Sequence, residues 1–369
     1  MSDVKYIAMH LPQFHPIPEN DAWWGRGFTE WTNVVRARPR FRGHYQPHLP
    51  ADLGFYDLRL PEARAAQAEL AARYGIDAFC YYHYWFGGRR LLERPVNEIL
   101  ASGEPDFPFC LCWANENWSR RWDGGDNQVL MRQEYSEADD RAHFEWLLTA
   151  FRDRRYVRIE GRPLFLIYRA HEVATLPHLV RSWQQWAQEA GLPGLFLVSV
   201  RNAWNESFNP LQHGLQASMK FQPFWRHVDR LAQGLLERAA YGLIQAHAPQ
   251  LGPLLKRVLS GRRGDRVIAY RDLVAAEMAS RSADFPEFPS VTPGWDNSPR
   301  RARGATIVHG STPALFGRWL RHETQRVRRL PPPLRIVFLN AWNEWGEGNH
   351  LEPDQRFGLA YLEEVKRAR

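Results

Sequence analysis

Cysteine is scarce in this 369-residue chain, which carries three of them, at positions 80, 110 and 112. Each lies in an apolar, strand-like run, and an odd number of thiols does not complete a disulfide framework. We therefore interpret Cys80, Cys110 and Cys112 as buried, reduced thiols of a cytoplasmic protein. The Cys-x-Cys spacing has no companion pair of cysteines or histidines, so we expect no metal site.

Long apolar runs and targeting signals are also missing. No run approaches the ~18 apolar residues that a membrane-spanning helix needs. The opening residues, MSDVKYIAMHLPQ, contain no basic segment followed by an apolar one, so we expect no signal peptide. Such a signal would accompany an exported polysaccharide hydrolase, and its absence fits a cytoplasmic transferase better.

The sequence has little that indicates a cofactor. No GxGxxG fingerprint follows a strand-like run, no Walker A sequence occurs, and no HExxH spacing connects the histidines. An Asp-x-Asp run of the kind that holds the metal of a nucleotide sugar is missing too. We expect no cofactor, and these absences weigh against a nucleotide-sugar-dependent transferase.

Positive charge is in excess, with a formal net charge of +7 and a pI of about 9.4. Part of the excess lies in two arginine-rich stretches, 256–271 and 299–303, which no nucleic-acid-binding motif accompanies. We therefore expect no nucleic-acid partner. Residues 224–288 are interpreted as a basic, helical insertion. It could contact a membrane surface or a lipid-linked glycan, or could simply be a solvated helical excursion.

Aromatic residues are abundant, with 16 tryptophans, 13 tyrosines and 20 phenylalanines. Tryptophan joins a large apolar face to one N–H donor, which suits a sugar ring with apolar C–H faces and a rim of hydroxyls. Most individual rings are expected to be plain core. Their excess beside carboxylates and amides nevertheless favours a carbohydrate cleft.

Eight strand-like apolar runs, mostly separated by helical stretches, predict a single (β/α)8 barrel with long βα loops. The helical stretch 61–75 has Pro61 at its start and Gly75 as a cap. The runs are continuously apolar, as parallel strands covered on both faces should be. They cover residues 6–11, 76–86, 107–116, 162–169, 194–202, 214–223, 289–297 and 334–342.

The carboxyl ends of barrel strands build the active site in this fold, so the polar and aromatic residues there should converge. The first βα loop, 12–56, is long and rich in aromatics, which also predicts function. Arg169 and Asn297 share these strand ends. The candidate substrate-binding residues are His10, Gln13, Trp24, Glu30, Trp31, Tyr82, His83, Trp113, Asn115, Glu116, Tyr168, Trp295, Asp296, Asn343 and Trp345.

Glu344 and Glu347 follow the last apolar run, in the sequence NAWNEWGEGNH. Gly346 and Gly348 make a turn plausible, so both carboxylates could face the barrel mouth. Neighbouring carboxylates cannot both ionise easily, which produces an acid and a base from one residue type. Glycoside cleavage needs such a pair. A helix-capping role for Glu347 is the alternative, and Glu116 is the rival acid.

Several long stretches, among them YIAMHLPQFHPIPENDAWWGRGFTEWTNV, WANENWSRRWDG and LNAWNEWGEGNHLEPD, resemble the WbsX family. That family is similar to the endo-α-mannosidases of glycoside hydrolase family 99. The resemblance implies a (β/α)8 glycosidase in which Glu344 is the base on the sugar's own 2-hydroxyl. It implies Glu347 as the general acid, with a 1,2-anhydro intermediate and retention. The mannosidases have histidine where this chain has Gly346.

The resemblance and the acid pair predict a retaining glycoside hydrolase acting on a bacterial surface polysaccharide that contains α-mannose or α-rhamnose. In both sugars the 2-hydroxyl lies trans to the leaving group, as internal attack requires. The alternatives are a glycosyltransferase of O-antigen or capsule assembly and a carbohydrate-binding protein on an inactive barrel. The expected partner is an oligosaccharide or polysaccharide substrate.

Overall fold

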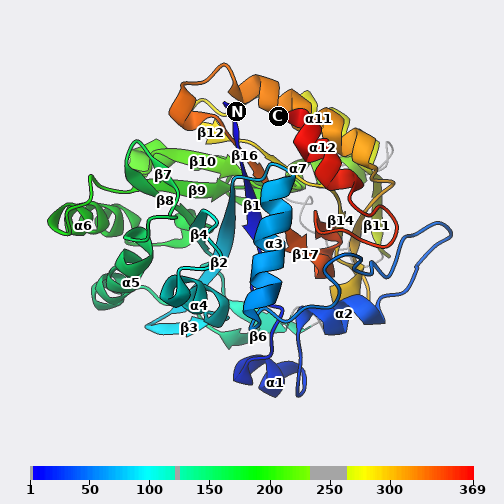
Figure 1. Ribbon diagram of the computed structural model, residues 1–369, viewed down its shortest axis with the longest axis horizontal. Coiled ribbons are helices and arrows are strands. Elements are labelled where there is room, and N and C mark those ends of the chain that lie inside the picture. The colour runs from blue at the N-terminus through cyan, green and yellow to red at the C-terminus, as the bar shows by residue number, and fades with distance from the viewer. Residues whose placement is uncertain (1–2, 121–124, 233–263) are drawn as a thin grey trace, which may run out of the picture.

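A ring of parallel strands forms the centre of the chain in the computed structural model, which describes residues 3–120, 125–232 and 264–369 (Figure 1). The strands pair in sequence order around the ring, and the predicted α/β barrel is confirmed. Its continuous members are β1 (Lys5–His10), β2 (Ala78–Phe86), β4 (Phe109–Trp113), β8 (Arg162–Ile167), β9 (Phe196–Arg201), β10 (Ala217–Lys220) and β16 (Ile336–Leu339).

The seventh strand of the ring is split in two. β12 (Glu287–Phe288) pairs with β10, and β13 (Ser290–Val291) pairs with β16. Pro289 lies between them and has no N–H for a ladder, although its carbonyl accepts from the N–H of Phe338 at 2.9 Å. The two short pieces together close the ring where one strand, 289–297, was expected.

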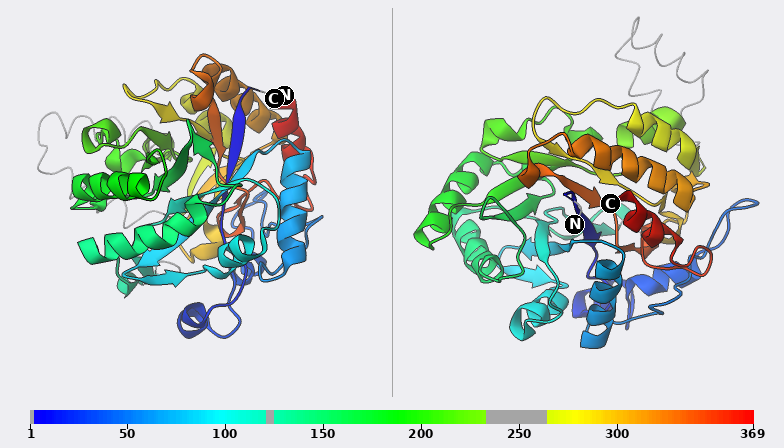
Figure 2. Two further views of the ribbon diagram at one scale, coloured as in Figure 1. Left: turned by 60° about the vertical axis from the view of Figure 1, so that its left-hand side comes forward. Right: turned by 45° about the horizontal axis from the view of Figure 1, so that its top comes forward.

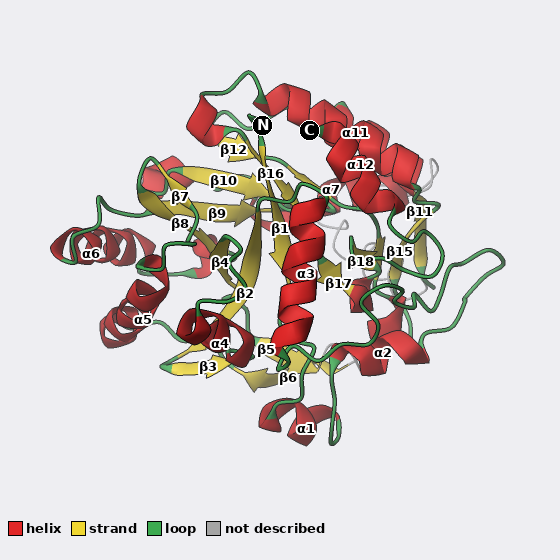
Figure 3. Cartoon of the chain, viewed as in Figure 1, coloured by secondary structure: helices red, strands yellow, loops and turns green. Residues whose placement is uncertain are grey.

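Helices cover the outside of the ring (Figure 3), because every residue of β4, β9, β10 and β16 is buried and both faces of these strands need cover. α3 begins at Pro61 and is followed by Gly75 at φ +85°, as predicted. The covering helices are α3 (Pro61–Arg73), α4 (Arg94–Ser102), α5 (Glu137–Phe151), α6 (Leu176–Glu189), α10 (Tyr270–Met278), α11 (Pro313–Val327) and α12 (Ala360–Ala368).

Smaller elements build the rim of the barrel. The first βα loop contains α1 (Pro18–Trp24) and α2 (Glu30–Arg36). The small sheets are β11 (Arg266–Ala269), β15 (Thr306–His309) and β14 (Trp295–Asp296), then β17 (Asn343–Glu344) with β18 (Asn349–His350), and β5 (Trp118–Arg120) with β6 (Gly125–Met131). β3 (Arg89–Leu91) pairs with β2, and β7 (Arg158–Ile159) with β8. Trp295 and Asp296 therefore lie in a separate sheet rather than in the seventh barrel strand.

The expected insertion, 224–288, contains α7 (Trp225–Ala232), β11 and α10 among the described residues. Most of its basic amphipathic stretch, 233–263, lies outside them, so contact with a membrane or a lipid-linked glycan stays a prediction. No helix in the described part of the chain is long and apolar enough to cross a membrane. The two ends of the chain lie side by side (Figure 2), where Arg328 contacts both Asp3 and the carbonyl of Arg369.

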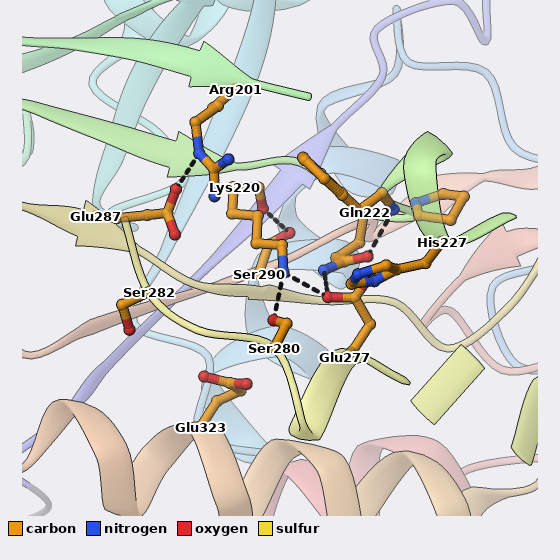
Figure 4. Close-up of polar contacts among 12 residues, drawn as sticks. Arg201, Lys220, Gln222, His227, Glu277, Ser280, Ser282, Glu287, Ser290 and Glu323 are labelled. Atoms are coloured by element: carbon orange, nitrogen blue, oxygen red, sulfur yellow. Dashed lines mark hydrogen bonds and ion pairs between the residues drawn. The ribbon is translucent and has the colours of Figure 1, made fainter. Parts of the chain in front are cut away.

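A buried polar network anchors α7 to the barrel (Figure 4). The carboxylate of Glu277, on α10, accepts from Lys220 Nζ at 2.6 Å, from Gln222 Nε2 at 2.9 Å and from His227 Nδ1 at 2.7 Å. Lys220 ends β10 and His227 lies on α7, so one carboxylate joins a strand end to two helices. The three free cysteines are buried, as expected.

Candidate active site

A cavity of about 740 Å³ lies where the carboxyl ends of the barrel strands meet the rim segments. Glu116 and Tyr168 line it directly after β4 and β8. The structure brings eight of the sequence-predicted residues together in its lining, namely Gln13, Trp24, Tyr82, Glu116, Tyr168, Trp295, Glu344 and Glu347. The strand-end positions Arg169 and Asn297 line it as well.

The acid pair sits on a turn after the last barrel strand. Glu344 ends β17, and Trp345–Glu347 form a single 3-10 turn. Gly348 closes this turn at φ +56°, a conformation that glycine adopts without strain. A Cβ at Gly348 would lie 3.0 Å from Asp296 Cβ, so the turn also packs tightly on β14. Both carboxylates consequently reach the same cavity.

Arg300 is the cation that contacts the acid pair. Its Nη2 lies 2.5 Å from Glu344 Oε1, its Nη1 lies 2.8 Å from Glu347 Oε1, and its Nε lies 2.8 Å from Glu30 Oε1. One planar guanidinium therefore contacts three carboxylates, which requires the two acids of the last turn to converge. Arg300 ends a short 3-10 helix after β14, in the arginine-rich stretch 299–303.

The electrostatics of the cluster favour proton retention on the acid pair. Burial raises the pKa of Glu347 to about 8 against the opposing charge of Arg300, and Glu344 and Glu30 add to the increase. Burial likewise raises the pKa of Glu344, again against Arg300. Burial acts to lower the pKa of Arg300, but the three carboxylates outweigh it and hold that pKa well above its usual value. Three acids thus share one permanent cation.

Gly346 provides the space for this arrangement. A Cβ there would lie 1.7 Å from Glu30 Oε1 and 2.8 Å from Arg300 Nε, far inside van der Waals contact. Glycine is therefore required wherever the Glu30–Arg300 pair occupies this position. The Glu30–Arg300 pair fills the space that a side chain at position 346 would need, which accounts for the glycine there.

Three predicted residues lie behind the barrel wall, away from the cavity lining. His10 is buried with its Nε2 3.2 Å from Gln67 Oε1. His83 is hydrogen-bonded to His143 at 2.9 Å. Trp113 packs edge-on against His143, with ring centroids 4.7 Å apart. All three fill space between strands and helices, because alternate residues of a barrel strand point outward.

Three further predicted residues, Trp31, Asn343 and Trp345, lie in or against the segment that carries the acid pair. Trp31 and Trp345 pack with ring centroids 5.5 Å apart. Trp345 donates to Glu352 at 2.6 Å and Trp31 to the carbonyl of Tyr56 at 2.9 Å. Asn343 donates to the hydroxyl of Tyr56 at 3.1 Å. Burial raises the pKa of Glu352 to about 7 although hydrogen bonds, that of Trp345 first, oppose the shift.

The remaining predicted residues outside the lining are also held by other groups. Asp296 accepts from His44 at 2.7 Å and Gln46 at 2.6 Å. Asn115 donates to the hydroxyl of Tyr135 at 2.9 Å. Glu30 forms an ion pair with Arg300. These contacts fix the loops that carry the cavity wall.

Sequence reasoning missed several lining residues, among them Arg300, Asn20, Tyr84, Trp118, Trp204 and Trp225. The arginine-rich stretch after Trp295 was the signal for Arg300. The signal for Trp204 was the sequence Asn-Ala-Trp-Asn-Glu, which occurs at residues 202–206 and again at residues 340–344, where it ends at Glu344. Asn20 is fully buried, and neither amide atom has a hydrogen-bond partner among the described residues. Nε2 of Gln13 likewise has no hydrogen-bond partner among the described residues. Such groups suit the hydroxyls of a bound sugar.

Comparison with known proteins identifies the family. Residues 6–365 match the family described as "Glycosyltransferase WbsX". The chain belongs to the WbsX family. It is 41% identical over 364 residues to "Uncharacterized protein WxcX" of two Xanthomonas campestris pv. campestris strains, ATCC 33913 and B100. That alignment covers 98% of this chain and 49% of each relative, so the chain spans about half the length of these curated relatives.

Solved glycoside hydrolases share the fold of this WbsX-family chain. The GH99 endo-alpha-mannosidase from Bacteroides thetaiotaomicron is 12% identical at a TM-score of 0.53, covering 100% of this chain and 97% of its own. A protein described as "Glycoside hydrolase-like protein" is 12% identical at a TM-score of 0.55, covering 100% and 94%. At these identities the similarity shows that the chains share a barrel fold.

Proposed function

We propose that this WbsX-family chain is a retaining glycoside hydrolase acting on a bacterial surface polysaccharide that contains α-mannose or α-rhamnose. One observation carries the proposal: Glu344 and Glu347 face one aromatic-walled cavity and share the guanidinium of Arg300. Buried acids of raised pKa, one of them still protonated at neutral pH, suit proton transfer to and from a sugar.

The two acids take different steps. Glu347, with a pKa of about 8, donates its proton to the glycosidic oxygen as the bond to C1 breaks. Glu344 has its Oε1 2.5 Å from Arg300 Nη2, a contact that favours the ionised form, and it removes the proton of the sugar's 2-hydroxyl. The freed O2 attacks C1 and gives a 1,2-anhydro sugar.

The second step consumes water. Glu347, now ionised, takes a proton from the water that attacks C1, and Glu344 returns its proton to O2 as the three-membered ring opens. Two inversions at C1 produce net retention. Internal attack requires the 2-hydroxyl to lie trans to the leaving group, which α-mannosides and α-rhamnosides satisfy and α-glucosides do not.

The cavity wall supports a carbohydrate ligand. Trp24, Trp204 and Trp225 present apolar rings to it, while the amide of Asn20 and Nε2 of Gln13 have no hydrogen-bond partner in the part of the chain that the structure describes. The guanidinium of Arg169 lies 4.2 Å from the ring of Trp204. These groups fit the two kinds of surface that a pyranose ring carries.

A glycosyltransferase is the second candidate, because the family description itself names that activity. A transferase would use a nucleotide-linked or lipid-linked sugar donor and would replace water with an acceptor hydroxyl. The same acid pair would serve either reaction.

The deciding experiment incubates the purified chain with mannose- and rhamnose-containing O-polysaccharides in the absence of nucleotide sugars. We expect shortened fragments whose newly formed reducing ends are first released as the α anomer by NMR. First release of the β anomer would reject the anhydro mechanism. No release of fragments, together with transfer of a sugar from a supplied donor to an acceptor, would establish the transferase.

A further inference from the structure

A second cavity of about 240 Å³ shares Trp295 with the lining of the first and has Asp296 in its own lining. Among the described residues, two histidines and one aspartate of its lining come together: His48, from the first βα loop, with His350 and Asp354, from the segment after the acid turn. Their ligand atoms all lie within 4.8 Å of one another.

We propose that His48, His350 and Asp354 bind one divalent transition-metal ion of the zinc class. The ion would take two imidazole nitrogens and one carboxylate oxygen, and the cavity would supply water as a fourth ligand. Histidine nitrogen and carboxylate oxygen together suit zinc-class ions rather than magnesium or calcium, which prefer oxygen ligands alone.

The orientation of His350 is fixed as a metal ligand requires. Its Nδ1 lies 2.9 Å from the carbonyl oxygen of Glu352, and only an N–H can bond there. Its Nε2 therefore carries a lone pair, which faces His48 Nδ1 at 2.8 Å. A backbone carbonyl that fixes the tautomer in this way is the usual outer partner of a metal-bound histidine.

Asp354 is oriented as well. Its Oδ1 accepts from the backbone N–H groups of Arg356 and Phe357, at 2.9 and 2.6 Å. Its Oδ2 is thereby turned toward His350 Nε2, 4.0 Å away. The backbone of Ala51 donates to the carbonyl of Pro353 at 2.9 Å, so the two ligand-bearing segments are already joined.

The geometry needs a small adjustment. Two ligand atoms bound tetrahedrally at 2.0–2.1 Å lie about 3.3 Å apart, so the two rings would separate by about 0.5 Å, and Asp354 Oδ2, now 4.0 Å from His350 Nε2, would move closer. The proton on His48 Nδ1 would move to Nε2 of the same ring, which leaves both imidazoles neutral.

The ion would stabilise the segment that carries Glu344 and Glu347. His350 lies in β18, opposite Asn343 of β17, and its ring stacks on Trp345 with centroids 3.6 Å apart. Trp345 separates the two acids of the candidate active site. Metal binding would join the first βα loop to the hairpin that carries this acid pair, as a structural rather than a reacting ion.

The test uses the chain after dialysis against EDTA, titrated with zinc chloride by calorimetry and with cobalt chloride by visible absorption. We expect one ion per chain, a rise in melting temperature, and the strong absorption of four-coordinate cobalt. His48→Gln should bind zinc at least ~100-fold more weakly. His309→Gln, at an exposed histidine in the same cavity, is the matched control and should bind as the unchanged chain does.

Either of two results would overturn the proposal: an unchanged chain that binds less than one zinc ion, or a His48→Gln chain that binds as tightly as the control. Should His48→Gln fail to fold, the cobalt spectrum of the unchanged chain decides, and a weak octahedral spectrum rejects the site. None of these readouts depends on glycosidase activity.

Discussion

Two buried ion clusters of this molecule have opposite ratios of acid to base. At the mouth of the barrel, one guanidinium, that of Arg300, contacts the carboxylates of Glu30, Glu344 and Glu347. Behind β10, one carboxylate, that of Glu277, accepts from several donors, Lys220 among them. Burial raises the pKa values of Glu344 and Glu347 in the first cluster, whereas its effect on the pKa of Glu277 in the second is outweighed.

The ratio explains the difference between the clusters. Burial acts to raise the pKa of Glu277, but the hydrogen bond from His227 and the charge of Lys220 outweigh it and lower that pKa. In the Arg300 cluster a single cation cannot neutralise every acid. An excess of acid next to a cavity provides a proton for chemistry, and an excess of donors in the core provides a fixed charge.

The largest expected effect comes from Glu347→Gln. Without the general acid, turnover of the natural glycan should fall about 10²–10⁴-fold. A synthetic glycoside with an acidic phenol as leaving group needs no protonation and should lose far less. Glu344→Gln should slow both substrates equally. Steady-state kinetics on the two substrates checks the assignment, and equal losses in Glu347→Gln would contradict it.

Glu277→Gln tests the structural cluster. The substitution leaves Lys220 buried without its counter-charge and should lower the free energy of unfolding by about 3–5 kcal/mol. The folded pKa of Glu277 is lowered, so its stabilisation is complete above the ordinary value of 4.5 and is lost as pH falls. Urea unfolding from pH 7 to pH 3 should show the difference between the two chains shrinking with acid.

Gly346→Ala tests the space around Arg300. Its Cβ would displace Glu30 or Arg300, at a cost of about 1–3 kcal/mol and with a fall in turnover of about tenfold or more. Gly264→Ala is the control, because a Cβ there meets nothing within 4 Å. Gly346→Ala should have a lower melting temperature and a lower turnover than Gly264→Ala. Equal values in the two variants would show that Glu30 and Arg300 move aside without cost.

The smallest effect is a pH dependence. In the proposed mechanism Glu347 acts in its protonated form, so kcat/KM should be halved near pH 8 and fall about tenfold per unit above it. Residual activity of Glu347→Gln on the phenol substrate should show no such alkaline limb. A limb that persists in the variant would assign the titration to another group.

Much of the barrel follows from local sequence. Each of the eight strand-like runs overlaps a barrel strand, the seventh only through β13, because continuous apolar runs between helices are stable only when both faces are covered. The prediction that the acids share the cavity follows from the same reasoning, since a turn after a barrel strand opens at its mouth. For individual side chains, local sequence is a weaker guide: His83 lies within β2 and Trp113 ends β4, yet both face the helices instead of the cavity.

The two copies of Asn-Ala-Trp-Asn-Glu show why local sequence does not decide which way a side chain faces. Trp204 and Trp342 occupy the same place in the two copies, yet Trp204 is 37% exposed and lines the cavity while Trp342 is fully buried. The sequence by itself determined the strands, the barrel and the position of the acid pair, because periodicity and turn chemistry are local. Only the tertiary structure decided that Arg300 lies between the acids and that His48 meets His350. Those contacts join segments far apart in the chain, and no local pattern encodes them.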